Sequence, residues 1–195
     1  LDPSTHRVAL AGRVGVVFGQ RTQPWWDLPL RESFELLRHI YRVPRERYAA
    51  NVRTLSELLD VHEFADVPVR QLSLGQRMRG DLVAALLHDP DVLFLDEPTI
   101  GLDVVAKARI RDFLTTINQE RGVTVLLTSH DLADVERLCR RVVVIDHGKV
   151  VHDGLLAALV EQVAGWRTLV VTTPAPVPPL AVAALAAAGL EVVKV

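Results

Sequence analysis

The spacing of apolar residues divides the chain into a helical first part and a second part in which strands and helices alternate. In the first part, apolar side chains recur every three to four residues, which is typical of amphipathic helices. The segments with this period are residues 30–41, 44–59 and 76–88. Two short runs farther along are residues 92–95, which are all apolar, and residues 123–127, which are apolar except for Thr124. This pattern predicts strands buried on both faces of a sheet.

Polar and glycine residues mark where the later elements begin and end. Asp103 and Asp131 are placed to cap two further helices, and Gly122 ends the first of them. Apolar residues on both sides of Asp146-His147-Gly148 predict a β-hairpin. Strands that alternate with helices in this way predict an α/β fold with a parallel sheet.

The tail of the chain has a different character. After Gly154 the pattern predicts a helix, a proline-rich loop and a last helix and strand, which together form a small α+β extension. We therefore expect a first domain over residues 1–160 and an extension over residues 161–195. Within the first domain, a helical subdomain is expected at about residues 28–88.

Composition narrows the classes of function. The 195 residues are 49% hydrophobic and 24% charged, which excludes intrinsic disorder. The formal net charge is −2 and the pI about 6.4, which argues against a nucleic-acid partner. The single cysteine, Cys139, cannot form an internal disulfide, so a reducing compartment is expected.

Two adjacent carboxylates follow the apolar run 92–95. Asp96 and Glu97 would lie at the carboxyl end of a strand, the edge where open α/β sheets bind ligands. Asp96 is suited to hold Mg²⁺ beside phosphates, and Glu97 to polarise an attacking water. The alternative is a strand that simply ends in surface acids.

Three more positions have both an ordinary and a chemical interpretation. Ser73 and Gly75 open a helix, as in a common N-cap, yet free amides at a helix start also bind anions. His130 follows the run 123–127 and would share the sheet edge with the two acids, although a histidine at a strand end is usually only polar surface. Gln20 follows a short apolar strand and has an oxygen for Mg²⁺ or water, although a glutamine in such a place is usually only polar surface.

The order and spacing of these residues resemble the ATP-binding subunit of an ABC transporter, over about residues 7–160. The motifs are Gln20, Leu72-Ser73-Leu74-Gly75-Gln76, Val92-Leu93-Phe94-Leu95-Asp96-Glu97, Thr99-Ile100-Gly101-Leu102-Asp103 and His130. The stretch Gly19-Gln20-Arg21-Thr22-Gln23-Pro24-Trp25-Trp26 is similar to one subgroup of bacterial ABC-2-type export ATPases.

This resemblance implies a fold, a chemistry and partners. The fold is a P-loop NTPase-like cassette with a parallel sheet core and an all-α signature subdomain. ATP and Mg²⁺ are the implied cofactors, with Glu97 and His130 catalytic and Gln20 and Asp96 on the metal. The residues implied to bind the nucleotide are Gln20, Ser73, Gly75, Gln76 and Asp103.

The implied partners are a second ATPase subunit, paired head to tail, and a membrane permease. The permease is expected to dock near Gln20–Leu30, including Trp25 and Trp26, although both tryptophans are also possible core residues. The implied location is cytoplasmic, on the inner face of the cell membrane through the permease.

One motif of the family is absent from the printed sequence. The phosphate-binding loop G-x-x-x-x-G-K-[ST] occurs nowhere, and only 19 residues precede Gln20. We therefore expect an N-terminally truncated cassette that is inactive by itself, from a parent that hydrolyses ATP to drive transport, with export as the expected direction. The alternatives are a non-catalytic docking pseudo-subunit and a soluble ABC ATPase.

Overall fold

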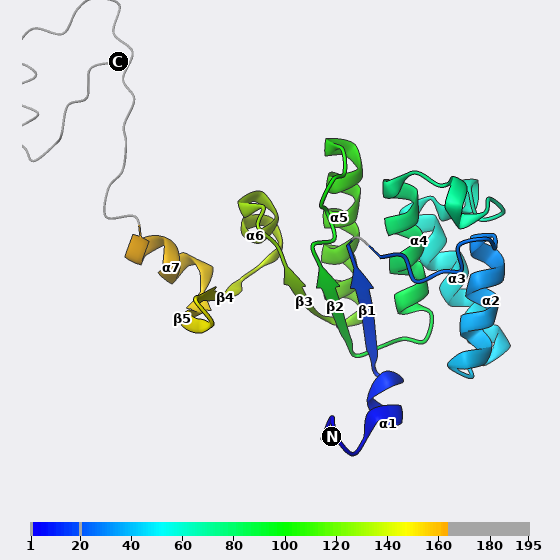
Figure 1. The fold of residues 1–195 in the computed structure, drawn as a ribbon, viewed down its shortest axis with the longest axis horizontal. Helices are drawn as coiled ribbons and strands as arrows, with labels where there is room; N and C mark the ends of the chain where they lie inside the picture. Colours follow the sequence, from blue (N-terminus) through cyan, green and yellow to red (C-terminus); the bar gives the residue numbers. More distant parts are fainter. Residues whose placement is uncertain (1, 20, 164–195) are drawn as a thin grey trace, which may run out of the picture. The chain divides into compact units, whose positions relative to one another are not determined.

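The computed structural model describes residues 2–19 and 21–163 and divides the chain into two units, Leu1–Leu156 and Ala157–Val195 (Figure 1). The strands are β1 (Val14–Phe18), β2 (Val92–Asp96), β3 (Thr124–Thr128), β4 (Arg141–Asp146) and β5 (Lys149–Leu155). The helices are α1 (Arg7–Ala11), α2 (Leu30–Ile40), α3 (Arg45–Leu59), α4 (Leu74–Leu86), α5 (Val104–Arg121), α6 (Leu132–Leu138) and α7 (Leu156–Val163). Two 3₁₀ turns lie at Val61–Glu63 and Val69–Gln71.

The centre of the first unit is a three-stranded parallel sheet in the order β1-β2-β3 (Figure 1). The register aligns Phe18 with Asp96 and Asp96 with Thr128, so all three strands end at one edge. The predicted α/β architecture with a parallel sheet is confirmed. Strand β2 lies in the middle and carries Asp96 at its end.

The prediction that residues 92–95 and 123–127 are buried on both faces is wrong in this structure. Leu93 and Leu95 are buried against α4 and α5, but Phe94 is 39% exposed and Leu126 is 53% exposed. Successive side chains of a strand point to opposite faces, so the residues between the buried ones form an open apolar face. Within the described residues, no helix covers this face.

Helices α2, α3 and α4 form the helical part that the apolar periods predicted. Leu30 and Phe34 of α2 pack with Leu55 and Leu59 of α3 in one core cluster, and all four are almost fully buried. The segment predicted to begin at Gln76 starts two residues earlier, because Ser73 caps α4. Between α3 and α4 the chain forms the short 3₁₀ turn Val69–Gln71.

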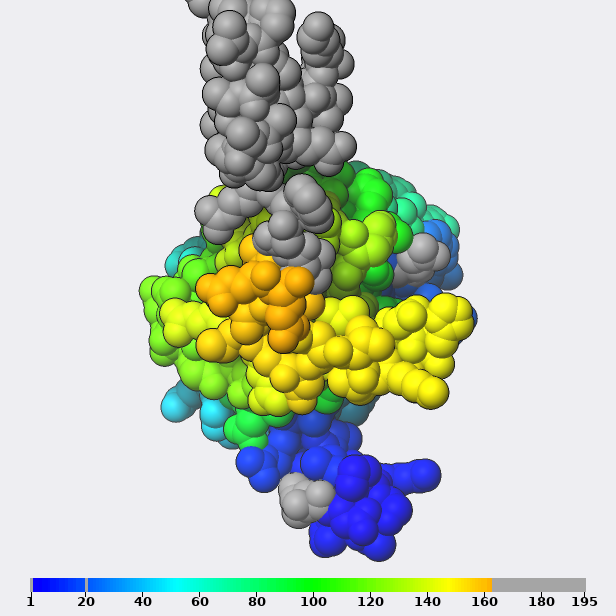
Figure 2. Space-filling view, turned by 90° about the vertical axis from the view of Figure 1, so that its left-hand side faces the viewer, coloured from blue at the N-terminus to red at the C-terminus, as the bar shows by residue number. Residues whose placement is uncertain are grey.

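The predicted capping and hairpin signals are confirmed. Asp103 and Asp131 accept hydrogen bonds from the amides of Ala106 and Ala133, and Gly122 ends α5 in the left-handed conformation. Strands β4 and β5 pair as an antiparallel hairpin. Figure 2 shows the hairpin (yellow) on the surface, where four of its apolar side chains are exposed: Val143, Ile145, Val150 and Val151.

The predicted C-terminal extension falls almost entirely outside the described residues. Helix α7 ends at Val163, and the predicted loop, last helix and last strand lie beyond it. The division at residue 160 therefore stays a prediction. None of the helices in the described part of the chain is long and apolar enough to cross a membrane.

Candidate functional site

The site is built where the three parallel strands end. The amide of Gly19 donates to the backbone oxygen of Asp96 at 2.7 Å. A Cβ atom at position 19 would lie 2.4 Å from the backbone oxygen of Glu97, so this close approach requires glycine. The Thr128 hydroxyl donates to Asp96 Oδ1 at 2.7 Å and fixes the orientation of that carboxylate.

Glu97 and His130 face each other across this edge. His130 Nδ1 lies 2.9 Å from Glu97 Oε1. The hydrogen bond to Glu97 and the charge of its carboxylate raise the pKa of His130. Glu97 has a positive φ of 51°, which is uncommon for a residue with a side chain and is found at functional sites. The turn is held by the Glu97 amide, which donates to Thr128.

A buried carboxylate supports the loops that carry this pair. Asp134 of α6 is 0% exposed and forms an ion pair with Arg111 of α5. The hydroxyl of Thr99, two residues after Glu97, donates to the same carboxylate. Asp134 thus connects the loop after β2 to the helix that follows His130.

The start of α4 holds the three predicted signature residues. The Gln76 amide donates to Ser73 Oγ at 3.2 Å, and Gln76 Oε1 accepts from the Ser73 amide at 2.9 Å, forming a capping box. A Cβ at Gly75 would meet Ala106 at 3.5 Å, an ordinary contact, so local packing does not require glycine there. The nucleotide role of Ser73, Gly75 and Gln76, like that of Asp103, stays a prediction.

The segment after β1 is anchored by its backbone and presents both tryptophans outward. Gln20, a predicted metal and nucleotide ligand, lies outside the described residues. Trp25 is 42% exposed and Trp26 is 49% exposed, so neither is a core residue. The Trp25 amide donates to the buried Ser33 hydroxyl at 3.1 Å. The predicted docking role of the two side chains is compatible with this exposure.

Sequence reasoning missed three polar residues that hold these loops: Asp81, Thr128 and Asp134. Asp81 of α4 is 3% exposed, although it lies among the apolar residues of a helix that is otherwise core. A charged residue on the apolar face of a predicted helix is the signal that would have found it, because such a group is buried only with partners. Thr128 and Asp134 give no comparable signal.

The ligand chemistry of the edge fits magnesium bound together with phosphates. In proteins, Mg²⁺ is held by one or two carboxylates together with substrate phosphates. Asp96, with its neighbour Glu97, offers such carboxylates. Across residues 2–19 and 21–163 there is no group of three or more His, Cys, Asp or Glu that could hold a metal without further ligands.

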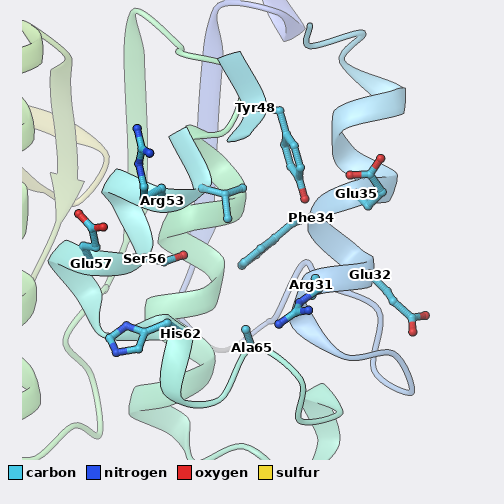
Figure 3. A pocket seen from close by; sticks show the side chains of 11 residues that line it. Arg31, Glu32, Phe34, Glu35, Tyr48, Arg53, Ser56, Glu57, His62 and Ala65 are labelled. Atoms are coloured by element: carbon cyan, nitrogen blue, oxygen red, sulfur yellow. The ribbon is translucent and has the colours of Figure 1, made fainter. Parts of the chain in front are cut away.

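A separate groove of about 850 Å³ lies between α2 and α3 (Figure 3). Phe34 and Tyr48 project into it, with Glu35 and His62 on its margins. None of the predicted catalytic or nucleotide-binding residues lines it. The groove is therefore distinct from the edge that carries Asp96 and Glu97.

Comparison with known proteins agrees with this geometry. The chain is 32% identical over 150 residues to the ABC transporter ATP-binding protein NatA of Bacillus subtilis, which covers 77% of this chain and 61% of NatA. It is 37% identical over 175 residues to the Nod factor export ATP-binding protein I of Paraburkholderia xenovorans, covering 90% of this chain and 57% of that protein. It is 36% identical over 180 residues to the daunorubicin resistance ATP-binding protein DrrA3 of Streptomyces coeruleorubidus, covering 92% of this chain and 56% of that protein. The chain thus spans only about three-fifths of the length of these relatives.

Solved structures give the same fold. The ATP-binding subunit of an ABC transporter superposes with a TM-score of 0.72 at 22% identity, covering 83% of this chain and 67% of that one. A dimeric ATP-binding cassette in a post-hydrolysis state, bound to ADP and Pi, superposes with a TM-score of 0.68 at 27% identity. The match covers 80% of this chain and 68% of that one. The α/β cassette architecture predicted from the motifs is confirmed.

A family model described as "AAA domain, putative AbiEii toxin, Type IV TA system" matches residues 21–134, more than half of the chain. The matched stretch contains the capped start of α4, the two acids Asp96 and Glu97 at the end of β2, and His130. The chain belongs to this AAA domain family, with the ABC cassette fold and with export-type ABC ATP-binding proteins among its relatives.

Proposed function

We propose that this chain is the larger part of an ATP-hydrolysing subunit of an ABC exporter, which couples hydrolysis to transport through a membrane permease. The observation that carries the proposal is the Glu97–His130 pair, 2.9 Å apart, next to Asp96 at the shared end of the parallel strands. If Glu97 were only a surface acid, it would need neither its positive φ nor a histidine partner. The export-type names of the relatives support the direction of transport.

Each residue of the edge has a role in this reaction. Asp96, oriented by the Thr128 hydroxyl, would hold Mg²⁺, whose charge stabilises the phosphate oxygens. Glu97 accepts a proton from the attacking water as general base. His130, whose pKa is raised by Glu97, holds that carboxylate in position and adds a donor near the γ-phosphate. Catalysis then consists mainly of positioning and charge stabilisation.

A second subunit supplies the other half of each site in this proposal. Ser73, Gly75 and Gln76 lie at the N-terminus of α4, where the helix dipole and the amides that the capping box does not use, those of Leu74 and Gly75, favour an anion. In the head-to-tail dimer they contact the nucleotide held by the partner. The exposed Trp25 and Trp26 contact the permease, because aromatic side chains are enriched at protein interfaces.

The proposal includes a longer parent protein that contributes residues not found among these 195. The printed sequence has no phosphate-binding loop, and the open face of the sheet exposes Phe94 and Leu126. Parallel sheets are normally covered on both faces. We propose that further chain of the parent covers this face and supplies the missing phosphate contacts and positive charge.

The 195-residue chain alone is therefore expected not to bind ATP–Mg or hydrolyse it, because its two carboxylates meet the phosphates without the cationic loop. Isothermal titration calorimetry of the chain with ATP and MgCl₂ tests this expectation. A dissociation constant below about 100 µM would contradict it.

In the full-length parent, Glu97→Gln is expected to lower ATP turnover by about 10²–10⁴-fold, since the amide cannot accept the proton. Nucleotide binding should persist and trap the ATP-bound dimer. Phosphate release measures turnover, and size-exclusion chromatography with ATP measures the dimer. Glu120→Gln, at the exposed end of α5, is the matched control and should leave both unchanged. Turnover of Glu97→Gln within about tenfold of the wild type would refute Glu97 as the base.

A further inference from the structure

Asp81 is a buried carboxylate that has no role in the reaction proposed for Asp96, Glu97 and His130. It lies inside α4, is 3% exposed, and burial raises its pKa to about 6. A leucine or asparagine at this position would avoid the cost of burying a charge. The partners of the carboxylate indicate what its presence achieves.

All hydrogen-bond partners found for Asp81 come from the segment after β1. The Thr22 hydroxyl donates at 2.9 Å to Oδ1 and lies 3.0 Å from Oδ2. The amide of Gln23 donates to Oδ1 at 2.9 Å. One carboxylate therefore fixes both the side chain of Thr22 and the backbone of Gln23.

The same face of α4 holds this segment at a second point. Arg77 lies four residues before Asp81, one turn along the helix and on the same face. Its guanidinium lies 5.3 Å from the ring centre of Trp26, within the range of a cation–π contact. Residues Thr22–Trp26 are thus attached to α4 at two positions, by Asp81 and by Arg77.

Helix α4 connects these attachments to the predicted signature. Gln76 precedes Asp81 by five residues, which is about 8 Å along a helix axis. A hydrogen-bonded helix with a buried face moves as a rigid element. A displacement of Thr22–Trp26 would therefore be passed to Ser73, Gly75 and Gln76.

We propose that Asp81 is a positioning residue that couples the permease-contacting segment, through Thr22 and Gln23, to the signature at the start of α4. The inference rests on the proposed function, since it assigns a route between the permease and the nucleotide site. It predicts that Asp81 affects how strongly the permease stimulates hydrolysis, rather than hydrolysis itself.

The test uses the full-length parent, with and without its permease in liposomes, and measures the ratio of stimulated to basal ATP turnover. Asp81→Leu removes both acceptor oxygens and is expected to lower the ratio by about fivefold or more, with basal turnover kept. Asp81→Asn keeps an acceptor for the Gln23 amide and should retain at least about half of the wild-type ratio. Rescue by asparagine separates the hydrogen bonds from the charge.

A second pair of variants tests the same link from the other side. Thr22→Val removes the donor, and Thr115→Val removes a half-buried threonine hydroxyl from α5 as a matched control. The ratio should fall for Thr22→Val and stay at the wild-type value for Thr115→Val. If Asp81→Leu does not fold, Thr22→Val decides the question.

A ratio within about twofold of the wild type for Thr22→Val, or for a folded Asp81→Leu, overturns the inference. A wild-type parent without ATP turnover overturns the proposed function instead. The two failures are distinguishable, because only the second appears in the wild type.

Discussion

The two faces of the central sheet are formed by the same three strands but have opposite environments. On one face, Val17, Leu93 and Leu95 are at most 2% exposed and pack against the helices. On the other face, Phe94 and Leu126 are exposed although they are as apolar as their neighbours. The strands therefore carry apolar residues for two covering layers, and the described residues supply one.

This difference separates the features that depend on short-range contacts from those that depend on a complete covering layer. The edge that carries Asp96 and Glu97 depends on the register of the strand ends and on short-range contacts, such as the hydrogen bond of Thr128 to Asp96. It is in place with one face of the sheet open. Burial of Phe94 would require residues other than those that the structure describes, and we have proposed that further chain of the parent supplies them.

The largest expected loss of stability comes from a substitution on the covered face of the sheet. Leu93→Ala should reduce the free energy of unfolding of the 195-residue chain by about 2–5 kcal/mol, because it removes buried methyl groups and leaves a cavity. Urea denaturation followed by circular dichroism measures the change. Leu126→Ala on the open face is the control, with an expected loss of at most about 1 kcal/mol. Equal losses would show that the two faces do not differ in solution.

Much of the fold followed from the sequence, since periodicity and capping residues act locally. The helices at 30–41 and 44–59, the caps at Asp103 and Asp131, and the hairpin around His147 were all predicted close to their observed bounds. The parallel sheet followed from the alternation of elements. Burial of residues 92–95 on both faces was predicted wrongly, because an apolar run shows that a covering layer suits the strand, not that one is present.

The site was predictable only in part for a similar reason. The sequence placed Asp96, Glu97 and His130 at one edge, since parallel strands end together. The Glu97–His130 contact and the support from Asp134 depend on the geometry of loops, which no periodicity records. The link from Asp81 to Thr22 joins residues 59 positions apart in the chain, and only the folded structure brings them together.

An intermediate effect on the free energy of unfolding is expected from the buried carboxylate of Asp81. Burial raises the pKa of Asp81 from 3.8 to about 6, against the opposing effects of Gln23, Thr22 and the Arg77 charge. Between about pH 4 and pH 6 the folded state holds a proton that the unfolded state releases, so stability falls as the pH rises through this window.

Asp81→Asn removes this dependence and keeps a hydrogen-bond acceptor. At pH 7.5 it should raise the free energy of unfolding by at most about 3 kcal/mol, and the gain should vanish near pH 4. Urea titrations of wild type and variant at several pH values measure the difference. A variant less stable than the wild type at pH 7.5 would mean that the ionised carboxylate is net stabilising.

The smallest effect in the 195-residue chain is expected on the open face, at Phe94. Phe94→Ser should change the free energy of unfolding of this chain by no more than about 1 kcal/mol, because the ring is already 39% exposed. It should also raise the solubility of the chain, since an exposed apolar patch favours association.

The same substitution in the full-length parent gives the sharper result. If further chain covers the open face, Phe94 is buried there, and Phe94→Ser should cost about 3 kcal/mol or more, as for a core aromatic residue. Urea denaturation of both proteins measures the two costs side by side. An equal, small cost in both would mean that the face is open in the parent as well. The apolar residues of that face would then have to be explained by an intermolecular contact, and the cassette would be missing a layer in its working form.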